Sequence, residues 1–174
     1  MTRRIVGMML GAAVVFGAVG CGGTTEGTPS TSAAQPALWN PCAEIPDDVL
    51  RASGVDPATE ESGVAGVHQS GWEICGWIGK SYAITVYSTR RTVAEFEKKP
   101  GNVDFRDVTV GGRDGRQFRV EGASKNLHCD VLFPVSQGGV LQLSISNRAS
   151  LDNPEDPCTV LPRVGELLVP VFPN

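Results

Sequence analysis

Apolar side chains alternate with polar ones in several stretches of this chain, and the period predicts β-strands. They occupy every second position of residues 81–88 (SYAITVYS) and of residues 138–146 (GGVLQLSIS), as in a strand with one buried face. The glutamine and serines of the second stretch are expected on the outer side. Residues 72–79 (WEICGWIG) are apolar on both sides, as a central strand should be. Three further runs complete a meander of strands (residues 105–110, 117–121 and 128–135).

Helices are predicted before and between these strands. Residues 39–55 begin with Asn40 as a cap and a proline at a first helical position, and Pro46 divides them into a turn and a short helix. Residues 92–95 (TVAE) form a capping box, which predicts a short helix ending near Lys99.

The last helix is predicted over residues 156–172 (DPCTVLPRVGELLVPVF), where Asp156 is placed to cap and apolar residues form a stripe. Pro162 and Gly165 are unfavourable inside a helix, so we expect a kink or a late restart there. Residues 111–116 (GGRDGR) superficially resemble a phosphate-binding loop, but a strand follows them, which favours a hairpin turn.

The order of these elements is helix, strands, helix, strands, helix. It predicts an α+β domain with a mainly antiparallel sheet packed by helices on one face.

The N-terminus carries a different pattern. Two arginines precede an uncharged apolar run of 16 residues, positions 5–20, which is shorter than the ~20 residues that a membrane-spanning helix needs. Positive charge, a short apolar run and small residues, in that order, predict a lipoprotein-type signal peptide over residues 1–20. Small residues lead directly into Cys21, as in a bacterial lipobox, so Cys21 is predicted to carry the lipid, palmitate chains included. The alternative is an ordinary signal peptide with an incidental cysteine.

Composition then divides the remaining chain. Residues 21–37 are predicted to be the lipidated cysteine and a flexible tether, because residues 22–37 lack large apolar side chains. Residues 38–174 suit a single globular domain. Removing the two N-terminal arginines from the 15 basic residues leaves 13 against 19 acidic ones, a net charge of −6. A mildly acidic chain without a basic cluster argues against nucleic acid as a partner.

The cysteine count supports an exported protein. Once Cys21 is assigned to lipid, four of the five cysteines remain, and an even number in an exported chain predicts two disulfides. Four cysteines allow three pairings. We favour Cys42–Cys75 with Cys129–Cys158, which fastens each terminal helix to a strand. Zinc is the rival interpretation, but the cysteines form no CxxC motif, and we expect no metal or cofactor.

Several of these motifs together resemble a family of actinobacterial, including mycobacterial, cell-envelope lipoproteins (LprB/LprC-like). They are WNPC at 39–42 with IPDDVLRASG after it, CGW at 75–77, GGRDG at 111–115, the strand cysteine at 129 and DPC at 156–158. The resemblance implies a lipid anchor on the extracytoplasmic face of the plasma membrane, and a fold similar to that of PsbP and Mog1-like proteins. It supplies no catalytic residues, because the biochemical role of that family is not established.

Candidate catalytic and metal-binding groups are few. The two histidines are His68, expected on the polar side of a strand, and His128. Neither adjoins a nucleophile motif. A deep polar pocket with a histidine beside a carboxylate would favour an enzyme. Asp152, Glu155 and Asp156 form a loose acidic cluster, but helix capping explains Asp156 better than calcium binding does.

Trp39 and Trp72 are the candidates for a ligand groove, because aromatic side chains supply large contact area. Trp77 is expected to pack on the disulfide of Cys75. We therefore expect a lipid-anchored extracytoplasmic protein with a non-enzymatic role, which binds an envelope protein, a lipid or a small-molecule ligand. The alternative is an envelope hydrolase whose active site is assembled only in space.

Overall fold

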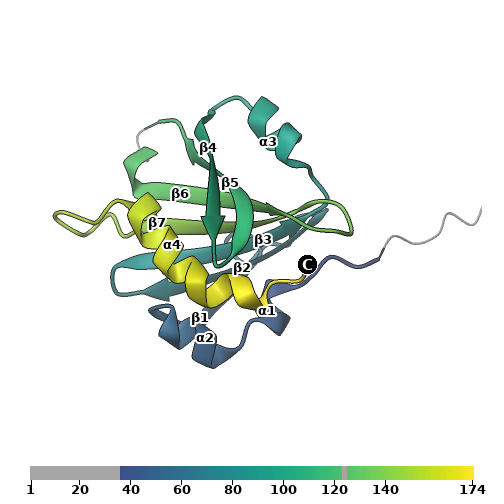
Figure 1. The fold of residues 1–174 in the computed structure, drawn as a ribbon. Helices are drawn as coiled ribbons and strands as arrows, with labels where there is room; N and C mark the ends of the chain where they lie inside the picture. Colours follow the sequence, from purple (N-terminus) through teal and green to yellow (C-terminus); the bar gives the residue numbers. More distant parts are fainter. Residues whose placement is uncertain (1–35, 123–124) are drawn as a thin grey trace, which may run out of the picture. The chain divides into compact units, whose positions relative to one another are not determined.

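A seven-stranded sheet organises the computed structural model, which describes residues 36–122 and 125–174 (Figure 1). The strand order is β1-β2-β3-β7-β6-β5-β4, and all neighbouring strands are antiparallel. Two meanders, β1 to β3 and β4 to β7, therefore meet at the β3–β7 pair. The strands are β1 (Val55–Ser62), β2 (Trp72–Gly79), β3 (Tyr82–Thr89), β4 (Asn102–Val110), β5 (Arg113–Val120), β6 (His128–Pro134) and β7 (Val140–Asn147).

The helices begin where the local capping signals predict. The Asn40 side chain accepts a hydrogen bond from the Cys42 amide at 3.0 Å, and the capping box of Thr92 and Glu95 is complete. Asp156 accepts from the Cys158 amide at 2.7 Å. The helices are α1 (Pro41–Glu44), α2 (Asp47–Ala52), α3 (Val93–Lys98), α4 (Pro157–Leu168) and the short 3₁₀ turns η1 (Lys125–Leu127) and η2 (Val169–Val171).

One face of the sheet is covered by α1, α2 and α4 and holds the main core. Helix α4 packs on β6 and β7, α1 packs on β2 and β3, and α2 packs on β1; Figure 1 shows α2 beside β1. The alternating apolar residues of the strands point into this core, as predicted, and are fully buried there (Ile84, Val86, Val131, Phe133, Leu143 and Ile145). Trp77 is 1% exposed in the same cluster.

Helix α4 runs unbroken from Pro157 to Leu168 with Pro162 inside it, so it does not restart late. Gly165 has a packing role instead, because a Cβ added there would lie 2.1 Å from Cγ1 of Val110. The absent side chain lets the helix approach the end of β4 closely.

Helix α3 lies on the opposite face of the sheet. Its Phe96 packs with Phe118, Leu132 and Val140 in a second, smaller cluster, and these residues alternate with the ones that face α4. The α+β class, the antiparallel sheet and the two disulfides are confirmed. Helices cover mainly one face, and α3 is the exception.

Two segments differ from the sequence-based expectations. Strand β1 was not predicted, because VDPATEES is polar and contains Pro57; it lies at an edge of the sheet, where both features are tolerated. The expectation that His68 lies on a strand is wrong. His68 is in the loop between β1 and β2, which contains one isolated bridge, from Val64 to Val67.

The predicted signal peptide and the lipidation site Cys21 lie outside the described residues. Within the described ranges, none of the helices has the length and apolar character needed to span a membrane.

Candidate functional site

A groove lies on the sheet face opposite α4, and we call it the sheet groove. Its volume is about 480 Å³, within the range of ~300–1,000 Å³ typical of small-molecule sites. Side chains from β2, β3, β5, β6, β7 and α3 line it, together with the loops after β1 and α3 (chiefly Trp72, Tyr87, Phe96, Lys99, Phe118, Val120, His128, Asp130, Gln142, Ser144 and Ser146).

The floor of the sheet groove is polar and centres on a buried carboxyl group. Asp130 and Ser144 are paired across β6 and β7 and are only 4% and 5% exposed. Oδ1 of Asp130 accepts a hydrogen bond from Nε2 of Gln142 at 2.8 Å. Burial raises the pKa of Asp130, and hydrogen bonds with the side chains of Gln142 and Ser144 oppose this rise. The floor therefore favours an uncharged carboxyl group more than solvent does.

A second polar pair occupies the end of the floor where β6 begins. His128 and Ser146 are directly opposite on β6 and β7, and a hydrogen bond of 2.7 Å joins His128 Nδ1 to Ser146 Oγ. His128 is two residues from Asp130, so both side chains point into the sheet groove. Hydroxyl, imidazole, amide and carboxyl groups thus share one face of two central strands.

The wall of the sheet groove is aromatic. Trp72 meets Tyr87 edge-on with ring centroids 6.2 Å apart and meets Phe96 at 6.1 Å. Phe96 in turn lies 6.0 Å from Phe118. Helix α3 supplies Phe96, whose carbonyl oxygen accepts a hydrogen bond of 2.9 Å from the Asn102 side chain. The capped helix is thereby joined to the start of β4, and its Phe96 completes the wall.

Apolar side chains continue onto the rim. Val64 and Val120 line the sheet groove and are 55% and 41% exposed. The site therefore offers polar groups at its base and apolar surface above them, an arrangement that suits a molecule with both characters.

The structure separates the two tryptophans that the sequence suggested for a ligand groove. Trp72 belongs to the sheet groove, whereas Trp39 lines a different hollow of about 230 Å³ near the C-terminus. There Trp39 packs edge-on against Phe172, with centroids 5.5 Å apart. The two residues do not form one site.

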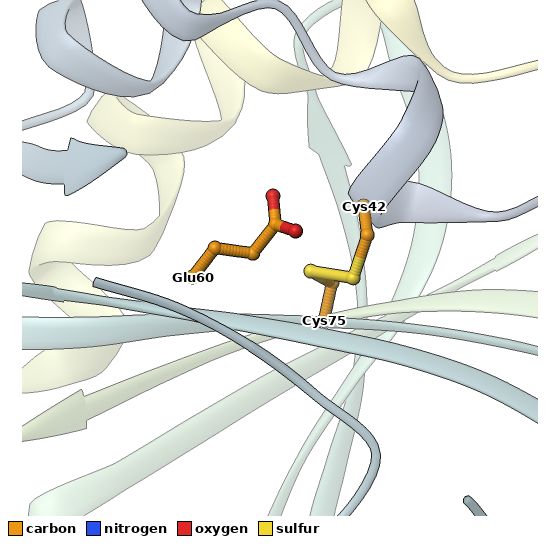
Figure 2. A group of neighbouring side chains, drawn as sticks. All are labelled: Cys42, Glu60 and Cys75. Atoms are coloured by element: carbon orange, nitrogen blue, oxygen red, sulfur yellow. A yellow bond between two sulfur atoms is a disulfide. The ribbon is translucent and has the colours of Figure 1, made fainter. Parts of the chain in front are cut away.

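The four cysteines form the favoured pairs, Cys42–Cys75 and Cys129–Cys158. The first joins α1 to β2, and the second joins β6 to α4, on the helix-covered face. Glu60 lies beside the first pair (Figure 2), and the three residues are the one group of potential metal ligands found in the described part of the chain. Because both sulfur atoms are in a disulfide, they supply no thiolate, and the group does not fit zinc.

The acidic residues near α4 are engaged by arginines. Both oxygens of Asp156 accept hydrogen bonds from Arg119 Nη2, at 2.6 and 2.7 Å, and Glu155 pairs with Arg163 at 2.7 Å. Asp156 also caps α4, as predicted. The carboxylates of Glu155 and Asp156 therefore help to hold the last helix in place.

Sequence reasoning missed the polar floor. The sequence pattern places Asp130 in a strand and Gln142, Ser144 and Ser146 on an outer, polar face. The alternation correctly placed them on one face, but it holds no information on whether α3 and β2 enclose that face. An acidic residue inside a strand that is otherwise apolar, as in HCDVLFP, was the one available signal.

Comparison with known proteins identifies the family. The model of a family described as protein of unknown function (DUF3558) matches residues 16–171, and the chain belongs to this family. No curated protein matches the sequence, and no solved structure matches it. The similarity to the PsbP and Mog1 fold stays a prediction.

Proposed function

For a member of a family without an assigned activity, we propose a lipid-anchored extracytoplasmic protein that binds a small amphipathic ligand in the sheet groove. The division of that groove into a buried polar floor and an aromatic wall carries the proposal. A purely structural sheet face has no need to bury Asp130 and Ser144, since burying polar groups is costly.

The location follows from separate features. The charged and apolar segments ahead of Cys21, and the resemblance to LprB/LprC-like lipoproteins, support lipidation at that residue. The two disulfides support an oxidising compartment. Detergent-phase partitioning of the Cys21→Ser variant tests the anchor: the variant should move to the aqueous phase. A variant that stays in the detergent phase contradicts lipidation at Cys21.

Ligand binding is tested on the mature chain carrying Cys21→Ser, exported so that disulfides form. Native mass spectrometry should show added mass that denaturation removes. Trp72→Ala should lower the ligand-bound fraction because it opens the wall of the sheet groove, whereas Trp39→Ala, in the separate hollow, should leave it unchanged. An equal loss in both variants, or no bound mass in any preparation, contradicts binding in the sheet groove.

A hydrolase is the second candidate, favoured by the 2.7 Å contact between His128 Nδ1 and Ser146 Oγ. A serine is activated as a nucleophile by a hydrogen-bonded histidine. A fluorophosphonate probe would label Ser146 in that case, and Ser146→Ala and His128→Ala would abolish the labelling. We favour binding because Asp130, the one acidic residue among those that line the sheet groove, bonds Gln142 through Oδ1, whereas a catalytic triad requires a carboxylate that orients the histidine.

A further inference from the structure

We infer that the group held at the floor of the sheet groove is uncharged and rich in hydroxyls, as in a saccharide ring, and that it binds over Asp130, Gln142 and Ser144. This inference rests on the proposed ligand-binding role and specifies the chemistry of that ligand.

The charges around the sheet groove disfavour an ionic ligand of either sign. Among its lining residues, Asp130 is acidic, Lys99 is basic and His128 is titratable. Asp130 is buried at the floor, while Lys99 is exposed at the rim. An anion placed on the floor would meet the carboxyl group of Asp130, and a cation entering past the rim would meet Lys99. Burial raises the pKa of Asp130, which leaves the floor closer to neutral.

The floor groups match hydroxyls in hydrogen-bonding capacity. The carboxyl group of Asp130 accepts a hydrogen bond, and the amide of Gln142 and the hydroxyls of Ser144 and Ser146 each donate and accept them. Every hydroxyl of a saccharide ring does the same. Cross-strand neighbours on one sheet face are ~4.5–5.5 Å apart, so these groups form a two-dimensional array. Such an array suits a ring that bears several hydroxyls better than a chain that ends in one polar group.

The aromatic wall supplies the complementary apolar contact. The faces of a saccharide ring present C–H groups, which pack favourably on aromatic side chains such as Trp72. Beyond the wall, Val64 and Val120 are exposed at the rim, where an alkyl chain attached to the ring would lie. The same site thus accepts a free saccharide or the sugar end of a glycolipid, and the experiment distinguishes these sources.

The probes share one eight-carbon chain and differ in the head group: a set of octyl glycosides (glucoside, galactoside and mannoside), octylammonium and octyl sulfate. Each is titrated below its micelle-forming concentration into the mature chain carrying Cys21→Ser. Calorimetry measures affinity, and amide chemical shifts of Gln142 and Ser144 locate the binding. At least one glycoside should bind in the sheet groove more tightly than both ions. A methyl glycoside that binds equally well indicates a free saccharide, and a preference for the octyl form indicates a glycolipid-like ligand.

Two variants test the floor directly. Asp130→Asn keeps the shape of the side chain and an oxygen that accepts hydrogen bonds, so glycoside affinity should change by no more than about threefold, whereas a cationic ligand would lose about tenfold or more. Ser144→Val should weaken the glycoside by about tenfold because the ligand loses a partner. Asp48→Asn, on an exposed turn of α2, is the matched control. Thermal unfolding confirms that each variant is folded.

The outcomes separate this inference from the proposed function. Tighter binding of octylammonium or octyl sulfate in the sheet groove overturns the saccharide assignment while the binding role stands. If none of the probes shifts the amide signals of Gln142 and Ser144, and the exported protein carries no bound mass, both the saccharide assignment and the proposed binding role are overturned.

Discussion

Replacing Gly165 by alanine tests the close contact between α4 and the end of β4. Glycine inside a helix costs roughly 0.5–1 kcal/mol relative to alanine, so helix propensity alone predicts that Gly165→Ala stabilises the protein. The structure predicts the opposite sign. The new Cβ would lie 2.1 Å from Cγ1 of Val110, whereas carbon atoms pack best at ~3.5–4.0 Å.

The overlap between the new Cβ at position 165 and Val110 cannot be relieved by a small movement. Val110 is 2% exposed, and its β-branched side chain has few rotamers. The neighbouring backbone also approaches the helix closely, because a Cβ on Gly111 would lie 2.9 Å from the carbonyl oxygen of Gly165. Overpacking of a core costs typically ~1–3 kcal/mol. After the gain in helix propensity, we expect a net loss of about 1–2 kcal/mol, or roughly 3–6 °C in Tm.

Thermal and urea unfolding of the oxidised protein measure this effect. Thr159→Ala, at an exposed position of α4, is the control for propensity and should be neutral or slightly stabilising. In a Val110→Ala background, where the overlapping methyl group is absent, Gly165→Ala should become neutral or stabilising. If Gly165→Ala alone raises Tm as Thr159→Ala does, the close helix–strand contact is refuted.

Three further predictions concern the disulfides and two carboxyl groups. Replacing Cys129 and Cys158 by serine should lower the free energy of unfolding by ~3.5 kcal/mol, because the bridge closes a 29-residue separation; urea unfolding compares the variant with the oxidised protein, and equal midpoints contradict the prediction. The folded-state pKa of Asp130 is raised above 3.8, so its contribution to stability is present below pH 3.8 and is lost as pH rises toward the folded pKa. Asp130→Asn should therefore gain stability relative to the parent as pH rises above 3.8, and a difference that does not change with pH argues against the buried carboxyl. Burial alone would raise the pKa of Asp156, but hydrogen bonds from Arg119 and the Cys158 amide hold it below 3.8, so its stabilisation is present above pH 3.8 and lost as pH falls through the lowered value. Asp156→Ala should cost about 1 kcal/mol at pH 7 through loss of the helix cap and less at pH 2, as measured by unfolding at the two pH values; an equal cost at both would assign the effect to something other than the carboxylate.

Local signals predicted the elements that local chemistry determines. The capping box at Thr92, the cap at Asn40 and the break at Pro46 each act within a few residues, so the sequence contains the whole interaction. Strand β1 has no such signal, because its residues are polar and it gains its place by pairing with β2. In the loop that holds His68, Gly66 adopts a positive φ that ends any extended pattern.

The sheet groove depended on contacts between distant segments. Alternation showed that Asp130 and Ser144 each share a strand face with other polar groups, but enclosure of that face requires Phe96 from α3 and Trp72 from β2. The β3–β7 pairing that brings the two meanders together joins residues far apart in the chain. A periodic pattern within one strand reports neither the partner strand nor the side chains that cover it.

The disulfides link the cysteines of the domain in chain order, first with second and third with fourth. A chain that emerges N-terminus first can therefore close Cys42–Cys75 correctly before Cys129 appears, and no reshuffling is needed afterwards. After the first disulfide has closed, one side of β3 stays unpaired until β7 is available. Until β7 pairs with it, β3 is an exposed edge strand. A chaperone that shields this edge would act after the first disulfide forms and before the second.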